Sequence, residues 1–147
     1  MIHYFDSSAL GKLAFDEPGT ERLRRLFEPL DTPEKATSHV TVLEFRSTLR
    51  RRQRAEEIPP ADAEELLLFF QGEIERISLQ PVNQVVLDLA AQVMDRQPLR
   101  SLDAIQLGSC LAVRENSSGK PVVFVCSDRR LLDAAKAEGL EVLNPAE

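Results

Sequence analysis

The sequence is poor in the residues that several common chemistries need. It has no tryptophan, one tyrosine, two histidines and two cysteines among 147 residues. It contains no Gly-x-Ser-x-Gly stretch to present a serine nucleophile, and no glycine-rich loop to hold a nucleotide phosphate. His3 and His39 lie in or beside predicted strands, and their spacing to the cysteines does not suggest a zinc site. Serine-hydrolase, nucleotide-binding and zinc chemistries are therefore unsupported.

Long apolar runs are also missing. No stretch approaches the ~20 apolar residues that cross a bilayer, and the N-terminus lacks the features of a secretory signal. A hydrophobic fraction of 43% with 29% charged residues is ordinary for a soluble globular protein. Cys110 and Cys126 are expected to be buried, reduced thiols. We therefore expect one cytoplasmic domain spanning residues 1–147, without membrane association.

The charge of the chain gives two opposing indications. A net charge of −6 argues, taken alone, against a nucleic-acid partner. However, 14 of the 18 basic residues are arginine, and five of these fall between Arg46 and Arg54. Arginine suits phosphate recognition better than lysine, although a charged run on a helix is more often simply solvated. Charge thus leaves nucleic-acid binding open.

Apolar stretches with strand character alternate with stretches at helical spacing. Strands are predicted at 2–5, 36–40, 77–79, 122–126 and 140–143. Helices are predicted at 9–15, 20–30, from 41 onward, from 59 to about 76, and at 83–97, 101–115 and 128–138. Short connections between alternating strands and helices favour an α/β fold, in which helices wrap a parallel sheet.

Two aspartates follow predicted strands. Asp6 and Asp128 each come after an apolar strand, stand next to a serine and precede a helix. In open parallel sheets ligands bind beyond the carboxyl ends of the strands, where both would lie. One such aspartate is commonly a helix N-cap, and for Asp6 that interpretation stands beside the functional one. Two of them, on strands that could be neighbours, favour a site.

Two further acids fall in predicted helices. Asp103 interrupts an apolar segment and shares a helix face with Leu107 and Cys110. A carboxylate there is costly unless it is paired or binds a metal, although the helix N-terminus could also stabilise it. Glu44 follows Thr41 at the spacing of a capping box. Spacing alone does not separate a capping role for Glu44 from a role in a site.

A group of four acids points to a divalent cation. Two carboxylates ~4 Å apart repel by roughly 4 kcal/mol at an effective dielectric constant of 20. One of them would take up a proton unless a cation compensates. Carboxylates and water suit Mg²⁺ or Mn²⁺, which can hold a phosphate and activate the attacking water. An acidic site therefore does not exclude a nucleic-acid substrate, because the metal reverses the local charge.

Four stretches carry a family resemblance. They are Asp6-Ser7-Ser8-Ala9-Leu10, Thr41-Val42-Leu43-Glu44-Phe45, Leu102-Asp103-Ala104-Ile105-Gln106-Leu107 and Ser127-Asp128-Arg129-Arg130-Leu131. Taken in this order they resemble the PIN-domain family, and more narrowly its VapC-type toxins of bacterial toxin–antitoxin pairs. The resemblance covers nearly the whole chain. It makes Glu44 an expected site residue, and it implies a three-layer α/β/α sandwich with a mostly parallel central sheet.

The resemblance also implies an activity and a set of site residues. The activity is that of an endoribonuclease that depends on Mg²⁺ or Mn²⁺. By position, Asp6 and Asp103 would be the main metal ligands, and Glu44 and Asp128 would complete the shell directly or through water. Two serines would support the site: Ser127 and Ser7. The candidate contacts to the RNA backbone, each with surface solvation as its alternative, are Arg46, Arg50, Arg129 and Arg130.

The same resemblance implies RNA as substrate, a homodimer, and a small antitoxin whose tail blocks the acidic cleft. The apolar run at 66–70 is too wide for one core-facing stripe, so part of it could face a partner chain. A non-catalytic binding module of the same fold is an alternative, disfavoured because all four acids are present. A DNA-directed nuclease is another, since no RNA-specific module is visible. With so few aromatic residues, recognition is expected to rely on backbone and shape.

Overall fold

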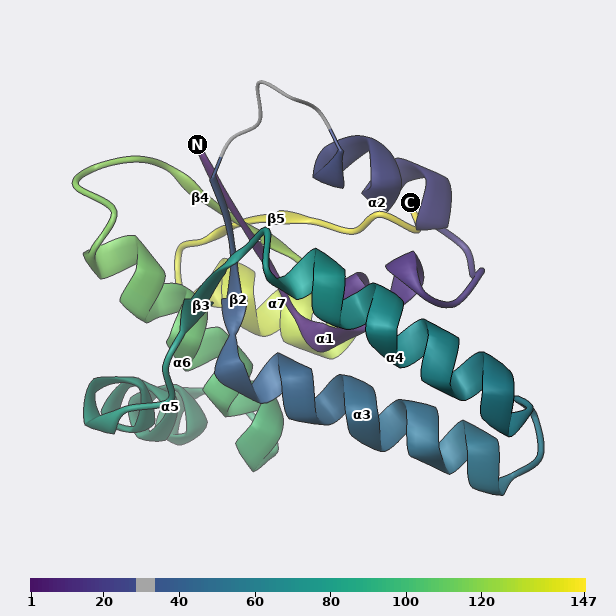
Figure 1. The fold of residues 1–147 in the computed structure, drawn as a ribbon. Helices are drawn as coiled ribbons and strands as arrows, with labels where there is room; N and C mark the ends of the chain where they lie inside the picture. The colour runs from purple at the N-terminus through teal and green to yellow at the C-terminus, as the bar shows by residue number, and fades with distance from the viewer. Residues whose placement is uncertain (29–33) are drawn as a thin grey trace.

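The computed structural model describes residues 1–28 and 34–147 and shows a five-stranded parallel sheet at their centre (Figure 1). Across the sheet the strands are β3 (Ser78–Gln80), β2 (Glu34–Ser38), β1 (Ile2–Phe5), β4 (Val122–Val125) and β5 (Glu141–Leu143). Strands β1 and β4 are buried along their whole length. Such continuously apolar strands are typical of a parallel sheet that is covered on both faces.

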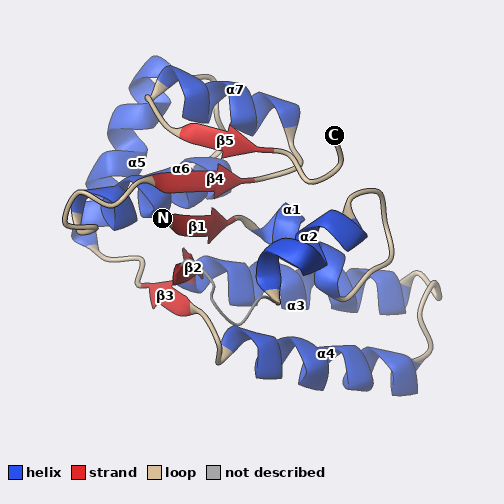
Figure 2. Cartoon of the chain, turned by 90° about the horizontal axis from the view of Figure 1, so that it is seen from above, coloured by secondary structure: helices blue, strands red, loops and turns tan. Residues whose placement is uncertain are grey.

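Helices cover both faces of the sheet (Figure 2). One face carries α1 (Ser7–Leu10), the 3-10 helix η1 (Gly11–Leu13), α2 (Thr20–Phe27), α3 (His39–Arg54) and α4 (Pro60–Ile74). The other carries α5 (Gln84–Arg96), α6 (Ser101–Glu115) and α7 (Arg129–Ala137). Each face has its own apolar core, one containing Phe5 and Phe45 and the other Tyr4 and Phe124. The predicted three-layer α/β/α sandwich is confirmed.

The order of the strands reverses direction at β1. The chain proceeds from β1 outward through β2 to β3, and then returns to place β4 on the other side of β1. In such sheets a crevice opens beyond the carboxyl ends of the two strands at the reversal. Strand β1 ends at Asp6, whose backbone N–H donates to Val125 O at 3.1 Å. The topology therefore brings the ends of β1 and β4 together.

Helix α3 begins earlier than the sequence predicts. The strand expected at 36–40 ends at Ser38, whose Oγ accepts a hydrogen bond from Val40 N at 3.1 Å and so caps the helix. Thr41 is buried inside the helix. The proposed capping box of Thr41 and Glu44 is therefore wrong, and Glu44 is available for other contacts.

Other differences in the elements are small. Helix α1 starts at Ser7, because Asp6 caps it, and it tightens to a 3-10 turn at Gly11. The expected end of the helix predicted at 20–30 lies outside the described residues. Both cysteines are buried and free, as expected. Within the described part of the chain, none of the helices has the length and apolar character needed to cross a membrane.

Helices α5 and α6 approach each other closely at Gly108. A Cβ atom at this position would lie 2.9 Å from Val86 O and 3.0 Å from Ala90 N. Both are backbone atoms of α5, so they cannot rotate away as a side chain would. The glycine therefore sets the distance at which α6 packs, and α6 carries Asp103.

We expect Gly108→Ala to lower the free energy of unfolding by ~1–3 kcal/mol, because the two helices must separate. Urea denaturation would measure this change. The matched control is Gly72→Ala in α4, where a Cβ would meet nothing within 4 Å. That change should raise the free energy of unfolding by up to ~1 kcal/mol through helix propensity. Equal midpoints for the two variants would contradict the close-packing interpretation.

Candidate active site

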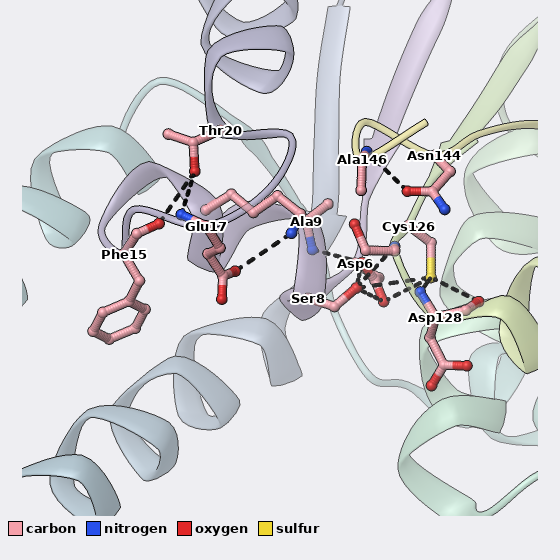
Figure 3. A network of polar contacts seen from close by, with 12 residues as sticks. Asp6, Ser8, Ala9, Phe15, Glu17, Thr20, Cys126, Asp128, Asn144 and Ala146 are labelled. Carbon is pink, nitrogen blue, oxygen red and sulfur yellow. Dashed lines mark hydrogen bonds and ion pairs between the residues drawn. The ribbon is translucent and has the colours of Figure 1, made fainter. Parts of the chain in front are cut away.

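Asp6 lies buried between the end of β1 and the start of α1, with an exposed fraction of 3%. Its Oδ1 accepts hydrogen bonds from Ala9 N at 2.9 Å and from Ser8 Oγ at 2.7 Å, and its Oδ2 lies 3.1 Å from Cys126 Sγ (Figure 3). Burial, with a smaller contribution from the nearby charge of Glu44, raises the pKa of Asp6 to about 6, and these hydrogen bonds, which favour the charged form, oppose the rise. Asp6 is thus both a helix cap and a buried, perturbed carboxylate.

Cys126 is a contact of Asp6 that the sequence did not indicate. It follows β4, and its thiol donates to Asp6 Oδ2 while its sulfur accepts from Asp128 N at 3.3 Å. Burial raises the pKa of this thiol far above its usual value, so it stays protonated and remains a donor. The only available signal was its place at a strand end, two residues before Asp128.

Glu44 projects from α3 and is held by Gln106 of α6. Gln106 Nε2 donates to Glu44 Oε1 at 2.8 Å and to Thr41 Oγ1 at 2.8 Å, while Gln106 Oε1 accepts from Tyr4 OH at 2.6 Å. Tyr4 is fully buried and its pKa is raised by that burial, so its hydroxyl keeps its proton. The amide of Gln106 is therefore fixed in one orientation, with its N–H groups toward Glu44 and Thr41.

The charge state of Glu44 reflects its surroundings. Burial raises the pKa of Glu44, hydrogen bonds from Gln106 and Ser7 oppose that rise, and the charge of Asp103 adds to it. Ser7, predicted to support the site, therefore lies close to one of the predicted acids, and both line the same groove.

We expect Gln106→Leu to lower the free energy of unfolding by roughly 2–4 kcal/mol. The substitution leaves the buried Tyr4 hydroxyl and the Glu44 carboxylate without this partner, at ~1–3 kcal/mol for each unsatisfied group, while Thr41 keeps its hydrogen bond with Thr37. Urea denaturation would measure the loss. Gln92→Leu, an exposed position on α5, is the control and should change the value by no more than ~0.5 kcal/mol. Equal stability of the two variants would mean that the Gln106 network contributes nothing.

Asp103 and Asp128 complete the acidic group. Asp103 is half-buried in the first turn of α6; burial raises its pKa, the charge of Asp128 adds to the rise, and Arg100 and Arg130 oppose it. Asp128 is exposed at the start of α7 and caps it, with Oδ1 accepting from Arg130 N at 2.9 Å. Both capping bonds of Asp128 reach Oδ1, so the cap does not use Oδ2.

The four acids gather at the carboxyl edge of the sheet. Electrostatic repulsion links Asp6 to Glu44, Glu44 to Asp103, and Asp103 to Asp128. Within residues 1–28 and 34–147, however, no three His, Cys, Asp or Glu side chains lie close enough together to hold a metal ion as they stand. The oxygen donors fit Mg²⁺ or Mn²⁺, and the exposed Asp128 side chain can change rotamer readily. Metal binding stays a prediction.

A groove of about 800 Å³ lies beside these acids. Four predicted site residues line it: Ser7, Glu44, Ser127 and Asp128. Asp6 lies beneath Ser8, which also lines the groove and accepts a hydrogen bond from Ser127 N at 3.1 Å. The groove continues along α3 to a set of charged residues that the sequence analysis did not single out: Lys12, Glu17, Arg51 and Arg52.

The four arginines predicted to contact RNA are absent from the described lining of this groove. Arg46 is exposed. Arg50 pairs with Glu64 at 2.8 Å, Arg129 pairs with Glu147, and Arg130 Nη2 donates to Pro98 O at 3.2 Å. The prediction that these side chains contact RNA stays untested. The arginine-rich helix does reach the groove, but through Arg51 and Arg52.

Known proteins resemble this chain in sequence and in structure. A family model described as PIN domain matches residues 3–137. Two curated relatives from Mycobacterium tuberculosis, named Ribonuclease VapC47 and Ribonuclease VapC46, are 28% and 29% identical over 144 residues; each match covers 97% of this chain and 96% or 97% of the relative. A toxin–antitoxin complex from Klebsiella pneumoniae has a TM-score of 0.69 at 15% identity, over 99% of this chain and 98% of that one, which bears on the fold alone. The resemblance inferred from the four acidic stretches is confirmed, and the chain belongs to the PIN-domain family.

Proposed function

We propose that this protein is a metal-dependent endoribonuclease and the toxin of a toxin–antitoxin pair. The observation that carries the proposal is the buried carboxylate of Asp6 at the reversal of the sheet, whose pKa is affected by Glu44, with Glu44 in turn affected by Asp103 and Asp103 by Asp128. Glu44 and Asp128 line a groove there. Strongly perturbed acids in a cleft are typical of functional sites. The names of the two curated relatives, which match nearly the full chain, support ribonuclease as the activity.

The proposed roles are metal ligation for the four acids and orientation of their carboxylates for neighbouring side chains. Asp6 and Asp103 would be the main ligands of Mg²⁺ or Mn²⁺, and Glu44 and Asp128 would complete the shell directly or through water. When bound, the ion supplies positive charge that holds a phosphate and activates water. Ser8 and Cys126 orient the Asp6 carboxylate, and Gln106 orients that of Glu44. Such outer contacts fix ligand geometry before the ion arrives.

The expected partners are RNA, a small antitoxin protein and a second copy of the chain in a cytoplasmic homodimer. Exposed apolar side chains support the presence of partner surfaces. Leu43 and Leu102 line the groove and are 68% and 49% exposed. In the apolar run at 66–70, Leu68 is 69% and Phe69 46% exposed, as expected if part of that run faces another chain.

The proposal can be tested with labelled tRNA, ribosomal RNA fragments and single-stranded DNA. Purified protein would be incubated with each in Mg²⁺, Mn²⁺ or EDTA. We expect cleavage of RNA only, and its loss in EDTA. Cleavage of DNA would indicate a DNA-directed nuclease, and a folded, metal-bound protein that cuts nothing in the panel would indicate a binding module.

A further inference from the structure

The groove contains a nearly buried lysine that does not pair with any of the four predicted site acids. Lys12 in η1 is 6% exposed and lines the groove. In the described part of the chain, its ammonium group makes one hydrogen bond, to Glu17 Oε1 at 3.5 Å. That distance exceeds the usual 2.7–3.2 Å, and an ammonium group has three donors. Lys12 therefore has strong donor capacity left for an anionic ligand in the groove.

Arg52 is held in place by contacts with Phe15 and with Glu17, which also pairs with Lys12. Its guanidinium group stacks on the ring of Phe15 at 4.1 Å and lies 3.8 Å from Glu17 Oε2. The two oxygens of Glu17 thus face two different cations, Lys12 and Arg52, and hold both in place. Stacking on an aromatic ring preserves the planar donor edge of an arginine for a further ligand.

The end of the groove that contains Lys12, Arg51 and Arg52, here called the cationic end, has an excess of positive charge. Arg51 also lines the groove, so three cations, Lys12, Arg51 and Arg52, share this lining with the single carboxylate of Glu17. Three positive charges against one negative charge leave an excess of two. The opposite end is lined by Glu44 and Asp128. The groove therefore carries opposite charges at its two ends.

The spacing of the two ends suits a nucleic-acid strand. Glu44 and Arg52 both lie on α3, and at a rise of 1.5 Å per residue they are roughly 12 Å apart along the helix. One strand of a base-stacked duplex advances ~3.4 Å along the axis per nucleotide, so that span corresponds to roughly three nucleotides of stacked strand. In Figure 3, Glu17 lies to one side of Ser8 and Asp6 to the other.

We propose that Lys12, Arg51 and Arg52 form a binding site for a backbone phosphate of the RNA strand that is cut at the acidic end. The proposal rests on the proposed ribonuclease function. Ammonium and guanidinium groups together are suited to phosphate oxygens, and the shared groove places this phosphate on the same strand as the scissile one. A phosphate site of this kind sets the register of the strand without reading its bases.

The test is the salt dependence of RNA binding. Fluorescence anisotropy would measure the Kd of a labelled single-stranded RNA between 50 and 200 mM salt, in EDTA to prevent cleavage. For single strands, each phosphate contact contributes about 0.7 to the slope of log Kd against log salt. Arg52→Gln should lower the slope by up to about 0.7, since Lys12 and Arg51 remain at the same phosphate, and should weaken binding roughly 3- to 10-fold at the lower salt. Lys12→Met should do the same.

Arg54→Gln is the matched control, because Arg54 is exposed on the same helix and lies outside the described groove lining. It should keep the wild-type slope. Circular dichroism would check the fold of Lys12→Met; the partly exposed Arg52 gives an independent result if that variant fails to fold. If wild-type protein cleaves RNA while Arg52→Gln keeps the wild-type slope and Kd, the inference is wrong. The cationic end would then be assigned to acidic groups of the antitoxin. If wild-type protein neither binds nor cuts RNA, the proposed function itself fails.

Discussion

Replacing Asp6 by asparagine should reduce RNA cleavage by ~10³-fold or more while the protein stays folded. Asparagine keeps an oxygen for the hydrogen bond from Ala9 N, so the cap of α1 survives. It removes the negative charge that a divalent cation would need. Asp103→Asn should have a similar effect, because Asp103 is the second main ligand in the proposed shell.

The measurement is the initial rate of cleavage of the RNA identified in the substrate panel, at saturating Mg²⁺ or Mn²⁺. Asp95→Asn, an exposed position on α5, is the matched control and should cleave at the wild-type rate. Circular dichroism would confirm that each variant is folded. A wild-type rate in Asp6→Asn, with contaminating nuclease excluded, would overturn the assignment of the active site.

The second large effect concerns the stability of the metal-free protein as a function of pH. Burial raises the pKa of Asp6 from 3.8 to about 6 in the folded protein. Between these values the folded state binds more protons than the unfolded state, so stability falls as the pH rises. The loss from this one group is about 3 kcal/mol once the pH exceeds the folded pKa, at 1.36 kcal/mol per unit. Below pH 3.8 this loss is absent.

Asp6→Asn isolates that contribution, because asparagine does not ionise. In EDTA, the difference in free energy of unfolding between variant and wild type should shift in favour of the variant by about 2.4 kcal/mol from pH 4, where the unfolded-state carboxyl is already partly ionised, to pH 7.5. Urea denaturation at several pH values would measure it. At pH 7.5, added Mn²⁺ should shift the difference in free energy of unfolding back in favour of the wild type, because only the wild type is stabilised by the ion. A difference that stays constant with pH would show that Asp6 is not perturbed.

The sequence was sufficient for the features that depend on local pattern. The apolar run at β4 and the helix Ser101–Glu115 appear where they were predicted. Asp6 and Asp128 lie at the same edge of the sheet because both follow strands of one parallel sheet, and that inference needs only strand order and direction. The family resemblance supplied what local pattern could not, namely that Glu44 joins them.

The errors and omissions share a physical cause, which is dependence on contacts distant in sequence. Both Ser38 and Thr41 are good N-cap residues. Which of the two caps α3 depends on where β2 ends. The pairing of Ser38 with Gln80 in β3 extends the strand to Ser38, so Ser38 is the cap. The hydrogen bond between Tyr4 and Gln106 joins residues 102 positions apart. The burial of Lys12 likewise depends on the fold around it, which helical spacing does not reveal.

Asp6 is both the N-cap of α1 and a candidate metal ligand, so activity can be lost in two different ways when it is replaced. Alanine at this position would remove the carboxylate and the cap of α1 together. An inactive Asp6→Ala protein could therefore have lost either the metal-binding carboxylate alone or the local structure of α1. Asparagine or serine would retain a capping oxygen and remove only the charge. A natural relative with either residue here is therefore expected to keep its architecture, and with it any protein-binding surface, after it has lost the capacity to cut.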